Sequence, residues 1–84
     1  MIAAPPGGFH PPVKRSVTIA AHATSISLEP QFWDALERAA RVRNLPLNAL
    51  VAQIDHLRSQ ADDPPNLASA LRSWLLAEAG VAQP

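Results

Sequence analysis

Few side chains in this sequence are of the types that carry out covalent chemistry, and their spacing does not assemble a catalytic site. Ser25 and Ser27 have no base at the spacing of a nucleophilic enzyme, and no Gly-x-Ser-x-Gly pattern surrounds them. The adjacent glycines Gly7 and Gly8 lie among prolines, so no glycine-rich phosphate loop is present. We therefore expect no catalytic residue, no cofactor and no enzymatic activity.

Candidate metal ligands are also scattered along the chain. His10, His22 and His56 are far apart in the sequence, and no cysteine is present to add thiolate ligands. Asp62 and Asp63 have no third ligand and are interpreted as acidic loop residues before a helix. The sequence therefore predicts no metal site, and His22 is interpreted as a surface residue between two strands.

Charge is balanced overall but unevenly distributed. The chain has 7 Lys and Arg against 7 Asp and Glu. Zero net charge counts against strong non-specific binding to nucleic acid, because that affinity comes from neutralised phosphates. Residues 1–28, however, contain Lys14 and Arg15 and no acid. A pair of chains would double this local positive charge.

One small domain is expected after a flexible start. Residues 1–13 are rich in proline and glycine and are predicted to form a flexible arm, followed by a domain over 14–80 and a tail over 81–84. The first fifteen residues lack the apolar run of a secretory signal, and no stretch approaches the ~18 apolar residues of a membrane span. We expect a cytoplasmic protein without a membrane partner.

Apolar and hydroxyl residues alternate over 16–20 and over 23–28, which is typical of strands. The link between the two segments is Ala21-His22, which is not a favoured turn of the Asn-Gly type. We therefore expect that the two strands do not pair with each other within one chain.

Three helices are predicted after the strands, each from apolar residues at helical spacing. The first begins at Pro30, where the missing N–H costs nothing, and ends near Asn44, which accepts a left-handed backbone. The second spans about 47–59. The third spans about 67–79, with Asn66 as its N-cap.

Four charged residues of the first helix are spaced for ion pairs within that helix. Asp34 precedes Arg38 by four positions, and Glu37 precedes Arg41 by four, each with the acid on the favoured N-terminal side. We therefore interpret Arg38 and Arg41 as a solvated, self-neutralised face rather than as phosphate ligands.

A chain of 84 residues buries a modest fraction of its surface, and small domains without disulfides or metals commonly depend on a partner chain. One strand has no sheet to join in this interpretation. The helices leave Trp33, Leu36, Leu50 and Ile54 without enough cover. The sequence therefore predicts a homodimer with no stable monomer.

The order of a short strand, a helix that begins at proline, a tight break and a second helix resembles the ribbon-helix-helix family. The matching residues are TSISLEPQFW at 24–33 and RNLPLNALV at 43–51. The fuller pattern, through NLASALRSWLL, covers about residues 13–79 and resembles a bacterial subfamily with an extra upstream strand and a third helix. The resemblance implies a mainly α fold with a short β ribbon, built as an intertwined homodimer.

In that family two chains pair their strands, and the ribbon enters the major groove of DNA. The resemblance implies that Ile26 and Leu28 face the shared core. It places DNA-binding residues among the arm cations, on the outward side of the second strand and in the first turn of the second helix: Lys14, Arg15, Ala23, Ser25, Ser27, Leu47, Asn48 and Ala49.

Two functions of different class remain open. One is a transcriptional regulator, a repressor or the antitoxin half of a toxin pair, that binds double-stranded DNA. The other is a dimeric protein-interaction module, antitoxin-like or an adaptor, with weak or no DNA reading. Zero net charge favours the second, as do Ala23 and Pro46, which stand where the subfamily is expected to carry polar residues.

Overall fold

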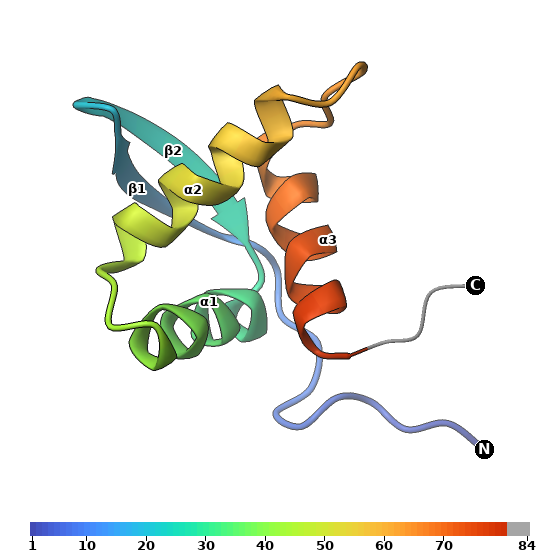
Figure 1. Ribbon diagram of the computed structural model, residues 1–84. Helices are drawn as coiled ribbons and strands as arrows, with labels where there is room; N and C mark the ends of the chain where they lie inside the picture. The colour runs from blue at the N-terminus through green and yellow to red at the C-terminus, as the bar shows by residue number, and fades with distance from the viewer. Residues whose placement is uncertain (81–84) are drawn as a thin grey trace.

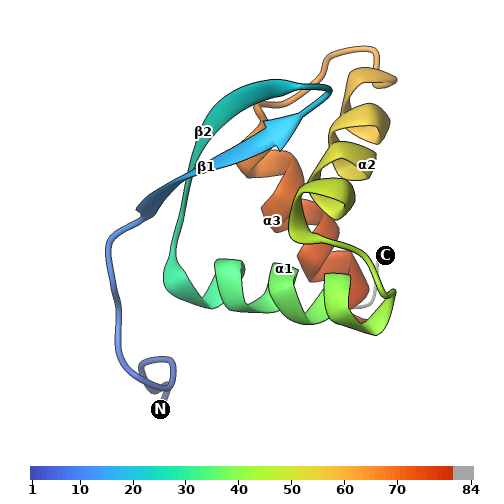
Figure 2. The same cartoon turned by 90° about the vertical axis from the view of Figure 1, so that its left-hand side faces the viewer.

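The computed structural model describes residues 1–80 as a two-stranded hairpin followed by three helices. The elements are β1 (Val13–Ile19), β2 (His22–Leu28), α1 (Pro30–Val42), α2 (Leu47–Ser59) and α3 (Leu67–Glu78). Figure 1 gives their order, and Figure 2 shows the hairpin above α1, with α2 and α3 beside them. The fold is mainly α with a short β ribbon, as predicted, and the predicted tail 81–84 lies outside the described residues.

The two strands pair with each other, antiparallel, within the one chain. The expectation that they do not pair was wrong, and the reason lies in the turn. Ala20 and Ala21 have φ of 50° and 67°, the left-handed backbone that both central residues of a type I′ turn adopt. Alanine gives no local signal for this turn, because the left-handed region costs an L-residue about 1–2 kcal/mol. Packing of β1 on α2 and of β2 on α3 offsets that cost.

Relief of this backbone strain is expected to stabilise the protein. Ala20→Asn combined with Ala21→Gly supplies the residues that favour φ above zero, and we expect the free energy of unfolding to rise by about 1 kcal/mol. For a domain of this size that corresponds to a melting temperature higher by roughly 4–8 °C. Calorimetry of the double variant measures it, and an unchanged or lower melting temperature would show that the turn is not left-handed in solution.

The core lies between the inner side of the hairpin and the three helices. Trp33, Leu36, Leu50 and Ile54 are at most 3% exposed in the single chain. The expectation that they lack cover was therefore wrong, because β1 gives β2 a strand to pair with and α3 covers the helices. The buried residues are Val17, Ile26, Leu28, Trp33, Leu36, Ala40, Leu50, Val51, Ile54, Leu71 and Leu75.

The helix ends follow their local sequence signals. The Asn66 side chain caps α3 by accepting a hydrogen bond from the Ser69 backbone N–H at 2.8 Å. Asn44 has a φ of 55°, and Gly80, after the end of α3, has a φ of 78°. These residues end α1 and α3 close to where the sequence predicts.

Three arginines join the elements in one recurring arrangement, in which each lies over an aromatic ring and pairs with a glutamate. Arg15 of β1 lies 4.7 Å from the centre of the Trp33 ring and pairs with Glu37 at 3.0 Å. Arg43, the C-cap residue of α1, lies over the ring of Trp74 and pairs with Glu78, both in α3. Arg72 of α3 lies over the ring of Phe32 in α1 and pairs with Glu29, the N-cap residue of α1.

The ion pairs expected within α1 were wrong. Glu37 pairs with Arg15 across from β1, and the described residues show neither the Asp34–Arg38 nor the Glu37–Arg41 pair. Arg38 and Arg41 are exposed, as expected, but they are not neutralised by their own helix. Tertiary packing decided the choice, because Arg15 reaches Glu37 from a strand that the sequence pattern did not place beside α1.

A glutamate at the start of α1 carries a shifted pKa. A hydrogen bond at its own backbone, and then the Arg72 guanidinium at 2.9 Å, hold the pKa of Glu29 below its usual value. A carboxylate whose pKa is lowered by folding stabilises the fold above its ordinary pKa. This contribution is lost as the pH falls through the lowered value.

Candidate nucleic-acid interface

The hairpin turns one side to the core and the other to solvent. Exposure alternates along both strands, and the register pairs Lys14 with Ser27, Ser16 with Ser25, and Thr18 with Ala23. Directly opposed residues of an antiparallel pair point to the same side. All six of these residues are exposed. They form one surface, called the outer face below: Lys14, Ser16, Thr18, Ala23, Ser25 and Ser27.

The outer face is polar, built of small residues and free of acids. Its four hydroxyl groups can each donate and accept a hydrogen bond, and Lys14 adds one positive charge. No helix covers it in Figure 2. A ribbon of two strands matches the width of the DNA major groove, which is about 12 Å. The surface therefore has the size and chemistry for contacts to base edges.

The two cations expected to bind phosphate from an arm lie instead within β1, and they point to opposite sides. Lys14 is exposed on the outer face and makes no ion pair within residues 1–80. Arg15 lies on the inner side, where Glu37 and the Trp33 ring hold its guanidinium. The structure thus brings Lys14 together with Ala23, Ser25 and Ser27, but not Arg15.

The first turn of α2, the second expected phosphate contact, begins after Pro46, which provides no side-chain cap. Asn48 is exposed, whereas Leu47 and Ala49 are partly buried. The N–H of Ala49 donates to the Pro46 carbonyl at 3.1 Å, so this group is not free as expected. In the described chain, the N–H groups of Leu47 and Asn48 have no backbone acceptor. This turn lies between the hairpin and α1 in both views.

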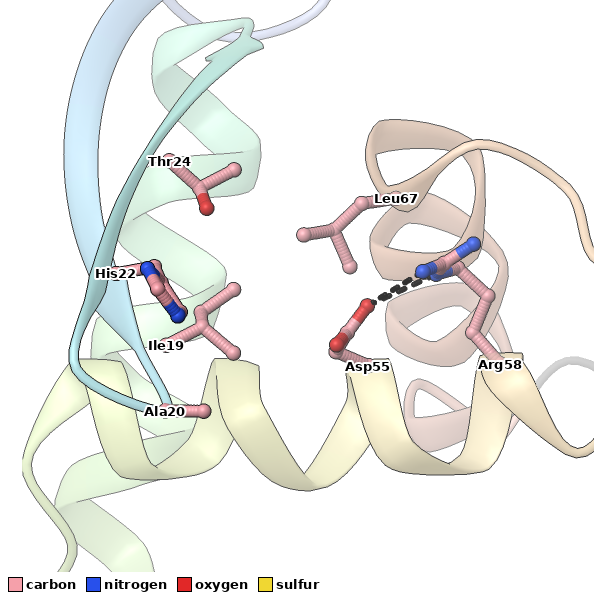
Figure 3. A pocket seen from close by; sticks show the side chains of 7 residues that line it. All are labelled: Ile19, Ala20, His22, Thr24, Asp55, Arg58 and Leu67. Carbon is pink, nitrogen blue, oxygen red and sulfur yellow. Dashed lines mark hydrogen bonds and ion pairs between the residues drawn. The ribbon is translucent and has the colours of Figure 1, made fainter.

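A hollow of about 430 Å³ lies at the turn of the hairpin, on its inner side. Figure 3 shows His22 and Thr24 of β2 on one side of it and Asp55 and Arg58 of α2 on the other. Arg58 pairs with Asp55 at 2.8 Å and also donates to the Pro65 carbonyl. The two charged side chains that line this hollow therefore neutralise each other. Within residues 1–80, no three side chains of metal-binding type come together.

Sequence reasoning missed two of the six residues of the outer face. Ser16 and Thr18 lie in the alternating pattern that predicts the first strand, but nothing in the sequence places that strand beside the second. The signal that would have found them is the register, and the register depends on the two alanines of the turn.

Comparison with known proteins agrees with this fold. Among the described residues, none of the helices combines the length and apolar character needed to cross a bilayer. A family model described as Ribbon-helix-helix domain matches residues 12–79, while curated proteins and solved structures give no match. Proteins of this family are typically DNA-binding regulators and antitoxins, are generally non-catalytic, and typically dimerise. Because the match covers most of its length, the chain belongs to the ribbon-helix-helix domain family.

Proposed function

We propose that this chain is a DNA-binding transcriptional regulator that places the outer face of its hairpin in the major groove. The observation that carries the proposal is the outer face itself, which combines four hydroxyls and a lysine with no acid. Membership of a family of typical DNA-binding regulators supports it.

Each part of the proposed interface has a distinct role. Ser25 and Ser27 contact base edges, where hydroxyls accept or donate with little selectivity, and the Ala23 methyl suits the thymine methyl group. Lys14 neutralises a phosphate beside the groove. The free N–H groups in the first turn of α2, with the exposed Asn48, offer a further anion contact at a helix N-terminus.

Dimerisation is part of the proposal. Domains of this family typically dimerise, and two chains double the positive charge brought to DNA. A single chain already buries the side chains of its core, and a partner would add to that burial. We therefore propose a homodimer, in the cytoplasm, that acts on double-stranded DNA.

Loss of Lys14 is expected to weaken binding to all DNA sequences alike. Lys14→Ala removes about one phosphate contact, and the slope of log affinity against log salt should fall by about one. Ser25→Ala should instead change the preference among sequences, by ~1–3 kcal/mol for a good contact. Fluorescence anisotropy over a salt series, with a selected site and a scrambled one, measures both effects.

Arg38→Ala is the matched control for Lys14→Ala, because it removes the same charge from an exposed residue of α1 that is not part of the outer face. The control should leave the salt slope unchanged. Equal losses for the two variants would contradict a contact through the outer face.

One observation favours the alternative, a protein-interaction module. Four of the cations are occupied in ion pairs within the chain, namely Arg15, Arg43, Arg58 and Arg72. The outer face itself carries a single cation, Lys14, which is a small positive charge for binding to DNA. Absence of salt-dependent binding to any duplex at low salt would favour this alternative.

A further inference from the structure

We infer that β1 is a phosphate-contacting strand, which lies beside the DNA-reading ribbon and binds the DNA backbone through Lys14, Ser16 and Thr18. The inference rests on the proposed function and on a ribbon made by the β2 strands of two chains, as the family resemblance implies. It assigns a role to β1, the extra upstream strand, which such a ribbon does not itself require.

The edge of β2 that faces away from β1 is open to a second chain. The sheet of one chain has two strands, so β2 has a neighbouring strand on one side only. A hollow of about 270 Å³ is lined by residues 24–27 of β2 and by Asn66, Leu67 and Ala68 at the start of α3, and by no residue of β1. Consecutive residues point to alternate sides of a strand, so a hollow that all four line lies at the free edge. A partner strand that pairs with β2 there leaves β1 on the outside of the sheet.

This order of strands places β1 at the wall of the major groove. Neighbouring strands lie about 4.8 Å apart, so the two β1 strands that flank a central pair of β2 strands are roughly 14 Å apart. The major groove is about 12 Å wide and is bordered by the sugar-phosphate backbone. The central pair therefore fits in the groove, whereas each β1 meets the backbone beside it.

The outward side chains of β1 have the chemistry for contacts to phosphate. Lys14, Ser16 and Thr18 are exposed on the same outer face as the β2 residues Ser25 and Ser27, and the row contains no acid. Lysine, serine and threonine all donate hydrogen bonds to phosphate oxygens, and such contacts position a protein on DNA without reading its sequence. The two strands therefore divide the work: β2 meets the bases, and β1 meets the backbone.

Added lysines test the position of β1 directly. Ser16→Lys and Thr18→Lys each place a cation on this row, so we expect tighter binding to every duplex. The slope of log affinity against log salt should steepen by about 0.9 for each added phosphate contact. Ser73→Lys is the matched control, because it adds the same charge at an exposed serine of α3 that is not part of the outer face, and it should leave the slope unchanged.

Removal of the hydroxyl groups separates a phosphate contact from a base contact. Ser16→Ala and Thr18→Val should each weaken binding by roughly 2–10-fold, to a selected duplex and to a scrambled one alike. The salt slope should not change, because no charge is removed. Thr18→Ser keeps the hydroxyl group and should bind as tightly as the unaltered protein. Fluorescence anisotropy over a salt series measures all variants, after circular dichroism has shown that each one folds.

The outcomes separate the inference from the proposed function. If the unaltered protein binds DNA but Ser16→Lys and Thr18→Lys bind no more tightly than Ser73→Lys, the role of β1 is wrong and DNA binding stands. If Ser16→Ala or Thr18→Val changes the preference between the two duplexes, β1 lies inside the groove, and again only the inference fails. If the unaltered protein shows no salt-dependent binding to any duplex at low salt, the proposed function fails and the inference fails with it.

Discussion

Leu50→Lys is expected to leave the chain unfolded, whereas the same substitution at Leu57 is tolerated. Leu50 is 2% exposed in the core, and Leu57, on the same helix, is 57% exposed. Truncation of a buried leucine alone costs about 2–5 kcal/mol. Lysine adds a buried ammonium group, and the described part of the chain buries no polar or charged side chain that could pair with it. The total approaches the whole stability of a small domain, about 5–15 kcal/mol.

Circular dichroism and urea unfolding compare the two variants. Leu50→Lys should show no cooperative transition, and Leu57→Lys should unfold within roughly 0.5 kcal/mol of the unaltered protein. A folded Leu50→Lys protein would mean that Leu50 is not in the core. Loss of folding in Leu57→Lys would show that this exposed face of α2 is covered, as a dimer contact would require.

Removal of α3 is the second change with a large expected effect. Leu71 is fully buried and Leu75 is 8% exposed, and α3 packs on α2, α1 and β2. Loss of these two leucines costs about 4–10 kcal/mol if each costs what a buried leucine usually does. We therefore expect that a chain ending at Pro65 does not fold cooperatively.

Two point variants accompany the truncation. Leu71→Ala should lower the free energy of unfolding by about 2–5 kcal/mol. Leu76→Ala, at a residue 55% exposed on the same helix, should have little effect. Thermal unfolding measures all three proteins. A truncated chain that melts at the temperature of the intact protein would mean that α3 is an independent appendage.

Local signals in the sequence were sufficient for the helices. A proline fits the first position of α1, Asn44 ends that helix with a left-handed backbone, and the Asn66 side chain caps α3. Each of these signals acts through backbone groups within a few residues, so no distant contact was needed. The outward direction of Ser25 and Ser27 also followed from alternation along one strand.

Tertiary structure alone decided how the strands pair and which carboxylate Arg15 pairs with. The left-handed turn at Ala20 and Ala21 is unfavourable locally and is stabilised by packing of the hairpin on α2 and α3. The sequence therefore contains no turn motif that predicts it. Arg15 meets Glu37 across 22 positions of the sequence, a separation at which spacing carries no information. Alternation along the strands therefore predicted a polar outer side, while the fold decided that the two strands of one chain pair with each other.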